Sequence, residues 1–148
     1  MAEPIPITSL EELADLALST KHVIIDFWAE WCPPCKAIGP LFSKLSKEYS
    51  VPGQLAFAKV DVDASQDIAG SYGVTAMPSF IILVDGEPTG VDVSQGKQLG
   101  GGAVMEGDKL IMIRGADPKN LTLVAAELGE AAKKAAGTGT GTEGESSS

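Results

Sequence analysis

The chain has 148 residues, a length that suits a single domain. Its 11 Lys and Arg residues are outnumbered by 20 Asp and Glu residues, which gives a formal net charge of −9 at pH 7. Such a surface repels the phosphates of nucleic acids and of anionic lipids, so we expect no nucleic-acid partner and no membrane partner.

The first residues lack the features of a targeting signal. Residues 1–13 (MAEPIPITSLEEL) carry acidic side chains where a secretory signal carries basic ones. No run in the chain approaches the ~18 apolar residues of a membrane span. We therefore expect a cytoplasmic protein. In a reducing compartment, two cysteines separated by two residues form a redox or metal motif rather than a structural disulfide.

Strands and helices alternate in the first half of the chain. A strand is predicted over residues 5–8, and Ser9 and Glu12 form a capping box at the start of a helix over 10–19. Residues 22–28 (HVIIDFW) are mostly β-branched or aromatic, which is typical of a central strand covered on both faces. The pattern then predicts a helix from about Pro34, a strand over 55–62 and a short helix over 65–72.

Two apolar strands and a final helix are predicted in the second half. The strands cover residues 79–84 and 109–114, and Asp117-Pro118 starts a helix that runs to about residue 134. The Gly-rich residues 86–108 interrupt this order. Residues 137–148 (GTGTGTEGESSS) have no apolar side chain to offset the entropy lost on ordering. We therefore expect one domain over residues 1–136 and a disordered tail.

Residues 31–36 (WCPPCK) carry the features of a redox centre. They follow an apolar strand and open an amphipathic helix, whose N-terminus presents free N–H groups and the positive end of a dipole. A thiolate is favoured there over a thiol, so we expect Cys32 to be nucleophilic near neutral pH. Cys35 lies one turn further along, within reach of a disulfide, and we expect it to be the more buried of the two.

This spacing predicts a two-step mechanism. Cys32 attacks a substrate disulfide and forms a mixed disulfide, and Cys35 then attacks Cys32 and releases the reduced product. Pro33 and Pro34 stiffen the turn, so the two sulfur atoms stay positioned for the second step.

Two other roles for the cysteine pair are a structural zinc site and an inert part of the core. A closed zinc site usually has four Cys or His ligands. The chain has two Cys and one His, so only unusual Asp or Glu ligation could complete such a site. Inert core cysteines do not require a strand–turn–helix setting. The redox interpretation is therefore favoured.

Asp26 interrupts the apolar strand six residues before Cys32. A carboxylate buried without partners is costly, and burial raises its pKa. Asp26 is therefore a candidate proton acceptor for Cys35, and the alternative is a solvated acid at the end of the strand. Pro78 opens the strand over 79–84, where proline is otherwise disfavoured. The residues alone leave open whether the Met77–Pro78 bond is cis.

These motifs together resemble the thioredoxin family. Residues 26–36 (DFWAEWCPPCK) match the active-site segment of that family, and Met77-Pro78 matches its cis-proline loop. The similarity covers residues 5 to about 128. Three further segments fall at family positions, namely Lys59-Val60-Asp61, Tyr72-Gly73-Val74 and Arg114-Gly115.

The resemblance implies an α/β thioredoxin fold, with a mixed central sheet of about five strands flanked by four helices. It also implies a thiol–disulfide oxidoreductase that reduces protein disulfides, with Cys32 as nucleophile, Cys35 as resolving thiol and Asp26 as buried proton acceptor. Pro78 is then a cis-proline that faces the disulfide, and the backbone of Met77 pairs with an extended substrate segment.

Further expectations of this resemblance concern substrates, partners and cofactors. No cofactor is bound, and electrons come from NADPH through a thioredoxin reductase, which becomes the expected partner besides protein disulfides. We expect a monomer. A shallow substrate groove is expected to be lined by Trp31, Pro33, Ala76, Met77, Pro78 and Gly115.

The chain departs from the family pattern at two places. Pro33 stands where the commoner motif has Gly, which removes a backbone N–H and some flexibility. Residues 86–108 replace a tight hairpin. Because the strand from Ser79 runs away from the cysteines at ~3.3 Å per residue, we expect the base of this insertion ~20 Å from them. A flexible decoration is favoured over a docking element.

Two competing functions remain. An oxidant or isomerase uses the same chemistry but requires an oxidising compartment, which the first residues argue against. A non-enzymatic adaptor requires neither cysteine, and only the insertion favours it. An adaptor tolerates Cys32→Ser, whereas a reductase does not.

Overall fold

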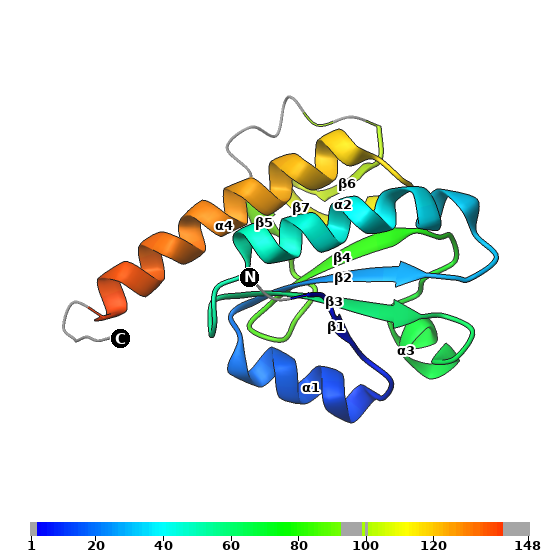
Figure 1. Cartoon of the computed structure of the whole chain (residues 1–148), viewed down its shortest axis with the longest axis horizontal. Helices are drawn as coiled ribbons and strands as arrows, with labels where there is room; N and C mark the ends of the chain where they lie inside the picture. The colour runs from blue at the N-terminus through cyan, green and yellow to red at the C-terminus, as the bar shows by residue number, and fades with distance from the viewer. Residues whose placement is uncertain (1–2, 93–98, 100, 141–148) are drawn as a thin grey trace.

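A mixed sheet forms the centre of the computed structural model, which describes residues 3–92, 99 and 101–140 (Figure 1). Among these residues the sheet has seven strands: β1 (Ile5–Pro6), β2 (His22–Trp28), β3 (Leu55–Asp61), β4 (Ser79–Val84), β5 (Val91–Asp92), β6 (Ala103–Glu106) and β7 (Lys109–Arg114). The helices in the described part are α1 (Leu10–Ser19), α2 (Pro33–Tyr49), α3 (Gln66–Ser71) and α4 (Pro118–Thr140).

The order of strands across the sheet is β1-β3-β2-β4-β7-β5, and β6 pairs with β7 outside this path. β1, β3 and β2 are parallel, whereas β4 and β7 are each antiparallel to their neighbours. Helices α2 and α4 cover one face of the sheet, and α1 and α3 cover the other (Figure 1). The α/β class and the mixed sheet flanked by four helices, predicted from the sequence, are confirmed for the described residues.

Two apolar clusters hold these layers together, one on each face of the sheet. Phe42 from α2 lies against Phe57 and Phe80, with ring centroids 5.4 and 5.6 Å apart. On the other face, Leu13 from α1, Ile68 from α3 and Ile81 from β4 belong to one buried cluster. Because β2 contributes buried side chains to both clusters, its apolar run has almost no polar interruption, as expected of a strand covered on both faces.

Local sequence signals set several element boundaries. The predicted bounds of α1, β2, β4 and β7 are confirmed. The Ser9 hydroxyl accepts the N–H of Glu12 at 3.1 Å, as the capping box predicts, while the Glu12 carboxylate accepts from the N–H and the hydroxyl of Thr8. Asp117 caps α4 by accepting the N–H of Asn120 at 3.0 Å. Among the described residues, no helix combines the length and the apolar character needed to cross a bilayer.

Helix α4 is longer than the sequence pattern predicted. It continues through Thr140, so residues 137–140, which we expected at the start of the tail, are helical. The rest of that segment, residues 141–148, lies outside the described residues. The Ala-rich residues 131–136 favour continuation of α4 past Ala132, its last buried residue in the described part, whereas Gly and Thr at 137–140 have low helix propensity, so propensity does not account for the last turn.

The inserted residues 86–108 contain two strands that the sequence did not predict, which raises the strand count from about five to seven. β5 pairs with β7 through Val91 and Asp92. β6 forms an antiparallel hairpin with β7, with Ala103 opposite Ile113 and Glu106 opposite Lys109. Residues 93–98 and 100 lie outside the described part. The described ends of the insertion are therefore part of the sheet rather than a loose decoration.

Candidate active site

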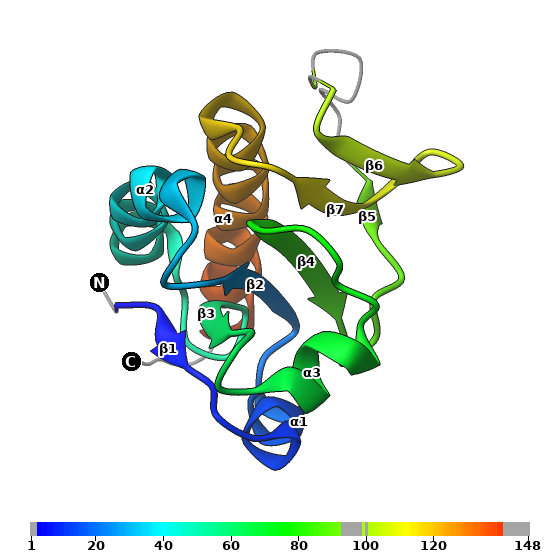
Figure 2. The same cartoon turned by 90° about the vertical axis from the view of Figure 1, so that its right-hand side faces the viewer.

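A disulfide joins Cys32 and Cys35 at the N-terminus of α2, with Cα atoms 5.3 Å apart. β2 delivers the chain to this point from the centre of the sheet, and α2 begins at Pro33, one residue earlier than predicted. The cysteine pair therefore lies at the end of the sheet where β2 and β3 finish (Figure 2).

Cys32 is the N-cap residue of α2, and its sulfur takes the place of a capping oxygen. The backbone N–H of Cys35 donates to Cys32 Sγ at 3.2 Å. Pro33 and Pro34 occupy the first helical positions and have no N–H, so Cys35 supplies the first free donor of the helix. This donor and the positive end of the helix dipole stabilise negative charge on Cys32 Sγ once the disulfide is reduced.

The two cysteines are equally buried in this disulfide form, each with 4% of its surface exposed. The prediction that Cys35 is the more buried of the two is therefore wrong for the oxidised state. The helical N-cap position turns Cys32 Sγ back over its own first turn, which shields it together with its partner.

A loop with a cis Met77–Pro78 bond lies against the disulfide. Met77 O is 3.7 Å from Cys32 Sγ. The hydroxyl of Ser79 donates to Ala76 O at 2.7 Å, and the N–H of Gly115 donates to Pro78 O at 2.8 Å. The loop is thus fixed on both sides, with Met77 beside Cys32 and Gly115 against Pro78.

Trp31 is the exposed residue that directly precedes Cys32. It is 64% exposed, and its Nε1 donates to Asp63 Oδ2 at 2.7 Å. The sequence analysis did not identify Asp63. The signal was its place just after β3, because the carboxyl ends of the parallel strands β2 and β3 meet at one edge of the sheet. Asp63 orients the indole ring, so Trp31 presents a fixed apolar face beside Cys32.

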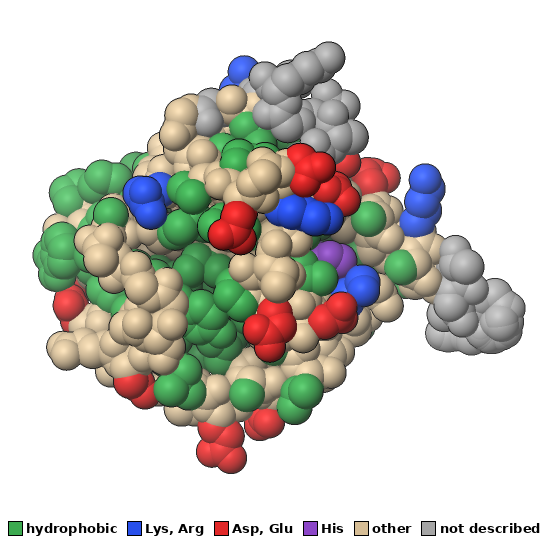
Figure 3. Space-filling model, turned by 180° about the vertical axis from the view of Figure 1, so that it is seen from behind, with side chains coloured by type: hydrophobic (Ala, Val, Ile, Leu, Met, Phe, Trp, Pro, Cys, Tyr) green, Lys and Arg blue, Asp and Glu red, His purple; other side chains and the backbone are tan. Residues whose placement is uncertain are grey.

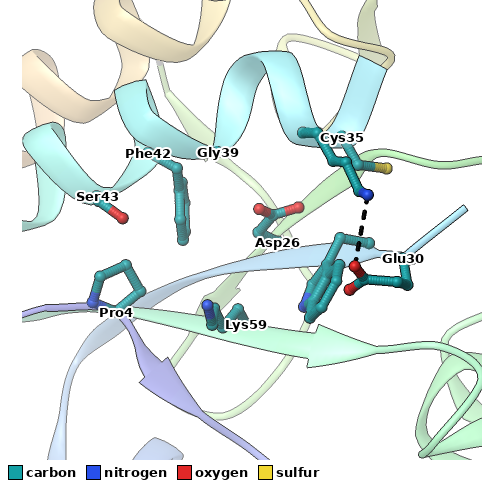
Figure 4. Close-up of a pocket in the computed structure, with 10 residues that line it drawn as sticks. Pro4, Asp26, Glu30, Cys35, Gly39, Phe42, Ser43 and Lys59 are labelled. Carbon is teal, nitrogen blue, oxygen red and sulfur yellow. Dashed lines mark ion pairs between the residues drawn. The ribbon is translucent and has the colours of Figure 1, made fainter. Parts of the chain in front are cut away.

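Asp26 lies in a cavity of about 290 Å³ between β2, β3 and α2 (Figure 4). Cys35 and Lys59 line the same cavity. Asp26 is 4% exposed, and its Oδ1 is buried without a hydrogen-bond partner among the residues that the structure describes. Burial raises the pKa of Asp26 from 3.8 to about 7, and the charge of Lys59 opposes this rise. Asp26 is therefore the buried acid that the sequence predicted, rather than a solvated residue.

The charged residues around this cavity were not identified from the sequence as parts of the site. Lys59 lies opposite Asp26 in the register of β3 against β2, and its ammonium group is 5.5 Å from the centroid of the Trp28 ring. Lys36 pairs with Glu30 at 3.4 Å at the mouth of the cavity (Figure 4). The register between two strands brings Lys59 to Asp26, and no motif in the sequence encodes that register.

The geometry gives the zinc alternative no ligand set. In the part of the chain that the structure describes, no group of three or more His, Cys, Asp or Glu side chains could hold a metal ion. The arrangement instead supports thiol chemistry. Cys32 Sγ lies at the N-cap of α2, and Cys35 lines the cavity that also holds Asp26, whose pKa is about 7.

Comparisons with known proteins agree with this geometry. The family model described as Thioredoxin matches residues 8–100. A thioredoxin-like protein of Fusarium culmorum is 47% identical over 128 residues, which cover 86% of this chain and 93% of that protein. A thioredoxin of Neurospora crassa is 40% identical over 134 residues, covering 90% of this chain and 93% of that protein.

Solved structures give the same result. The oxidized form of mitochondrial thioredoxin 3 from Saccharomyces cerevisiae superimposes with a TM-score of 0.61 at 33% identity, covering 83% of this chain and 93% of that chain. The thioredoxin of Malassezia sympodialis superimposes with a TM-score of 0.63 at 31% identity, covering 87% of this chain and 96% of that chain.

Proposed function

The chain belongs to the thioredoxin family of thiol–disulfide oxidoreductases, and from this premise we propose that it acts as a reductant of protein disulfides, with Cys32 as the attacking residue. The observation that carries this proposal is the N-cap position of Cys32, where the N–H of Cys35 reaches its sulfur at 3.2 Å. An electron pair on Cys32 Sγ is stabilised there, which keeps a nucleophilic thiolate available near neutral pH.

In the first step, the Cys32 thiolate attacks one sulfur of the substrate disulfide. A bond forms between Cys32 and that sulfur, the substrate S–S bond breaks, and the other substrate sulfur leaves as a thiolate. Approach of an extended substrate segment is supported by the position of Met77, whose carbonyl oxygen is 3.7 Å from Cys32 Sγ, so a segment that pairs with the Met77 backbone would lie beside the nucleophile. We assign Trp31, Pro33, Ala76, Pro78 and Gly115 to the walls of the substrate groove.

In the second step, Cys35 attacks Cys32 Sγ and closes the disulfide, and the second substrate sulfur leaves. The dithiol has then lost two electrons to the substrate. Attack requires that Cys35 lose its proton, and we assign Asp26 as the acceptor because both residues line one cavity. A carboxyl group with a pKa of about 7 both accepts a proton from a thiol and returns it to water near neutral pH.

The reduced form is restored by electrons from NADPH, which we assign to a thioredoxin reductase as partner. The proposal needs no bound cofactor, since the redox-active group is the cysteine pair itself. We propose the cytoplasm as compartment: both cysteines of the chain belong to the redox pair, which suits a reducing environment without structural disulfides. A fluorescent fusion to the full chain tests the compartment directly.

The competing direction is oxidation or isomerisation of substrates. Pro33 is relevant to this direction. A second proline makes the turn that holds the disulfide less flexible and removes one backbone N–H donor from it. The direction follows from the reduction potential of the pair and not from the fold.

Equilibration of the Cys32–Cys35 pair against glutathione buffers tests the proposal. Cytosolic glutathione lies at about −220 to −260 mV by extraction. We expect a more negative potential, together with reduction of insulin by the wild type in the presence of NADPH and a thioredoxin reductase. A potential well above that range assigns the chain to oxidation or isomerisation instead. Retained insulin reduction in Cys32→Ser contradicts the assigned nucleophile.

A further inference from the structure

An apolar groove of about 540 Å³ lies on the face of the sheet that carries α1 and α3. Its floor includes Ile81 from β4 and Ile111 and Met112 from β7, and its lower side is formed by Leu10 and Tyr72. Leu10 is 41% exposed, and Ile111, Met112 and Tyr72 are half-buried. Figure 3 shows hydrophobic side chains gathered in a hollow on this side of the molecule, with acidic side chains around it. The groove is separate from the cavity below Cys35.

The groove is open because the sheet extends beyond its helices. α1 and α3 lie below β2 and β4, whereas the hairpin of β6 and β7 projects past them (Figure 2). On the opposite face, α4 covers β7 and buries Leu110 and Ile113. Met112, the residue before Ile113 in β7, lies on the other face of the sheet. It points away from α4 and packs only at the edge of the core. No helix of the described part covers this stretch of β7 on the groove side.

Two acidic side chains, Glu87 and Glu106, form the walls of the groove. Both are exposed, and neither forms an ion pair with a described residue. Two nearby lysines pair with other carboxylates, Lys21 with Asp85 at 3.5 Å and Lys109 with Asp92 at 3.0 Å. Arg114 lies at the edge of the floor, with Nη2 3.9 Å from Met112 Sδ. Among the described residues, the side chains that line the groove include two carboxylates and no basic group, so the charge of the lining itself is negative.

The charge of Glu87 acts on the lower side of the groove. Both Glu87 and Tyr72 line the groove, and the charge of Glu87 adds to the effect of burial in raising the pKa of Tyr72. A cation bound between the walls would meet both carboxylates, whereas an anion would meet repulsion from each of them.

We propose that this groove docks a polypeptide segment of a partner protein that carries apolar side chains together with lysine or arginine. The walls are built by the inserted residues, since Glu87 and Glu106 both belong to 86–108, while the floor belongs to β4 and β7. The insertion thus gives the chain a binding surface additional to the thiol site.

Charge argues against two other occupants. A second copy of this chain carries a formal net charge of −9, so two acidic surfaces would meet in a dimer through this face. The C-terminal residues 137–148 contain Glu143 and Glu145 and no apolar side chain, so they offer neither the hydrophobic contact nor the cation that the groove requires. A basic, apolar segment satisfies both requirements.

The test uses two synthetic helical peptides with the same leucine stripe, one flanked by lysines and the other by glutamates. Binding to the full chain is followed by methyl NMR of Ile111 and Met112 and by fluorescence anisotropy. We expect the lysine peptide to shift these methyl signals and the glutamate peptide to leave them unchanged. Absence of shifts with the lysine peptide at millimolar concentration overturns the proposal, as does equal binding of both peptides.

A matched pair of double variants locates the site. Glu87→Gln with Glu106→Gln is expected to weaken binding of the lysine peptide roughly three- to tenfold, in the range of two exposed ion pairs. Glu48→Gln with Glu130→Gln removes the same charge from α2 and α4 and is expected to leave the affinity unchanged. If both double variants weaken binding of the lysine peptide equally, the effect is one of net charge, and the proposed site is wrong. Concentration-dependent self-association that shields the same methyl groups assigns the face to a second copy and also overturns it.

Discussion

The backbone N–H of Arg114 donates a hydrogen bond of 2.7 Å to the carbonyl oxygen of Gly102. The next residue, Gly115, donates to Pro78 O at 2.8 Å. Gly102, within the inserted segment, therefore lies near the loop that faces the disulfide. The sequence analysis expected the insertion ~20 Å from the cysteines by counting residues along β4. That count applies to its first residues, but Gly102 and the start of β6 lie at the active-site end of β7, and β6 then runs away from the active site toward the turn before Lys109.

The contact between Gly102 and Arg114 predicts a specific cost for a single methyl group. A Cβ atom on Gly102 would lie 2.7 Å from Arg114 O, whereas a Cβ on Gly101 would meet no atom within 4 Å. We expect Gly102→Ala to lower the free energy of unfolding by about 1–3 kcal/mol, because backbone must shift to admit it. Gly101→Ala is the matched control, with little change or a slight gain.

Urea denaturation of both variants measures the difference. Equal stability of the two would mean that residues 101–102 do not lie against β7, and would remove the basis for placing the insertion near the active-site end. Loss of stability confined to Gly102→Ala supports the register of β6 on β7.

The order of the two thiol steps predicts opposite behaviour for the two cysteine variants. Cys35→Ser keeps the nucleophile but removes the resolving sulfur, so the mixed disulfide between Cys32 and substrate is expected to accumulate. Cys32→Ser is expected to form no adduct, because Cys35 lies inside the first turn of α2, behind the N-cap position that residue 32 occupies. Mass spectrometry of the intact protein after incubation with a disulfide-bonded peptide detects the adduct, and dithiothreitol releases it. An adduct on Cys35 in Cys32→Ser would show that the roles are reversed.

The burial of Asp26 predicts a pH-dependent gain in stability for Asp26→Asn. The pKa of Asp26 is raised to about 7 in the fold, so between its ordinary pKa of 3.8 and pH 7 the folded state binds more protons than the unfolded state. Wild-type stability therefore falls as pH rises through that interval and carries the full penalty above pH 7. Asp26→Asn lacks the charge and escapes this penalty.

The expected difference in unfolding free energy between Asp26→Asn and the wild type is small near pH 4 and reaches a few kcal/mol at most above pH 7. Guanidinium denaturation at a series of pH values measures it. Asp67→Asn, on the exposed face of α3, serves as control and is expected to leave the pH profile unchanged. A difference that does not change with pH would mean that Asp26 is ionised at no cost in the fold.

Much of the fold could be predicted because its signals are local. β2 could be predicted from its consecutive apolar residues alone. The caps of α1 and α4 depend on side chains within three positions of the groups that they cap. The cysteine pair and Asp26 were identified for the same reason: the spacing within 26–36 is short enough for one strand and one helical turn to fix the geometry.

The features that were missed depend on contacts between distant segments. β5 and β6 have two and four residues and no alternating pattern, and they are strands only because β7 offers them an edge. Lys59 reaches Asp26 through the register of β3 on β2. Asp63 reaches Trp31 across 32 positions. Registers and sheet edges are properties of pairing, so the sequence of one segment does not reveal them.

The cavity shared by Asp26 and Cys35 makes a last prediction, about the rate of the resolving step. A protonated carboxyl group cannot accept a proton, so release of the substrate from the mixed disulfide is expected to accelerate as pH rises through about 7 in the wild type. In Asp26→Asn the thiol of Cys35 must ionise without this base. Release is then expected to be about 10²-fold slower at pH 7. Its pH dependence is expected to move toward the ordinary thiol pKa of about 8.5.

Stopped-flow fluorescence measures this step when Cys32 is reacted with a disulfide peptide that carries a quenched dye, whose release reports attack by Cys35. The first step, attack by Cys32, is expected to keep its rate in Asp26→Asn, because Asp26 lines the cavity on the Cys35 side. Asp67→Asn again controls for the loss of one carboxylate. A structural role for Asp26 would slow release equally at every pH. An unchanged pH profile in Asp26→Asn would therefore remove Asp26 from the proton path, whereas a profile displaced to higher pH identifies it as the acceptor.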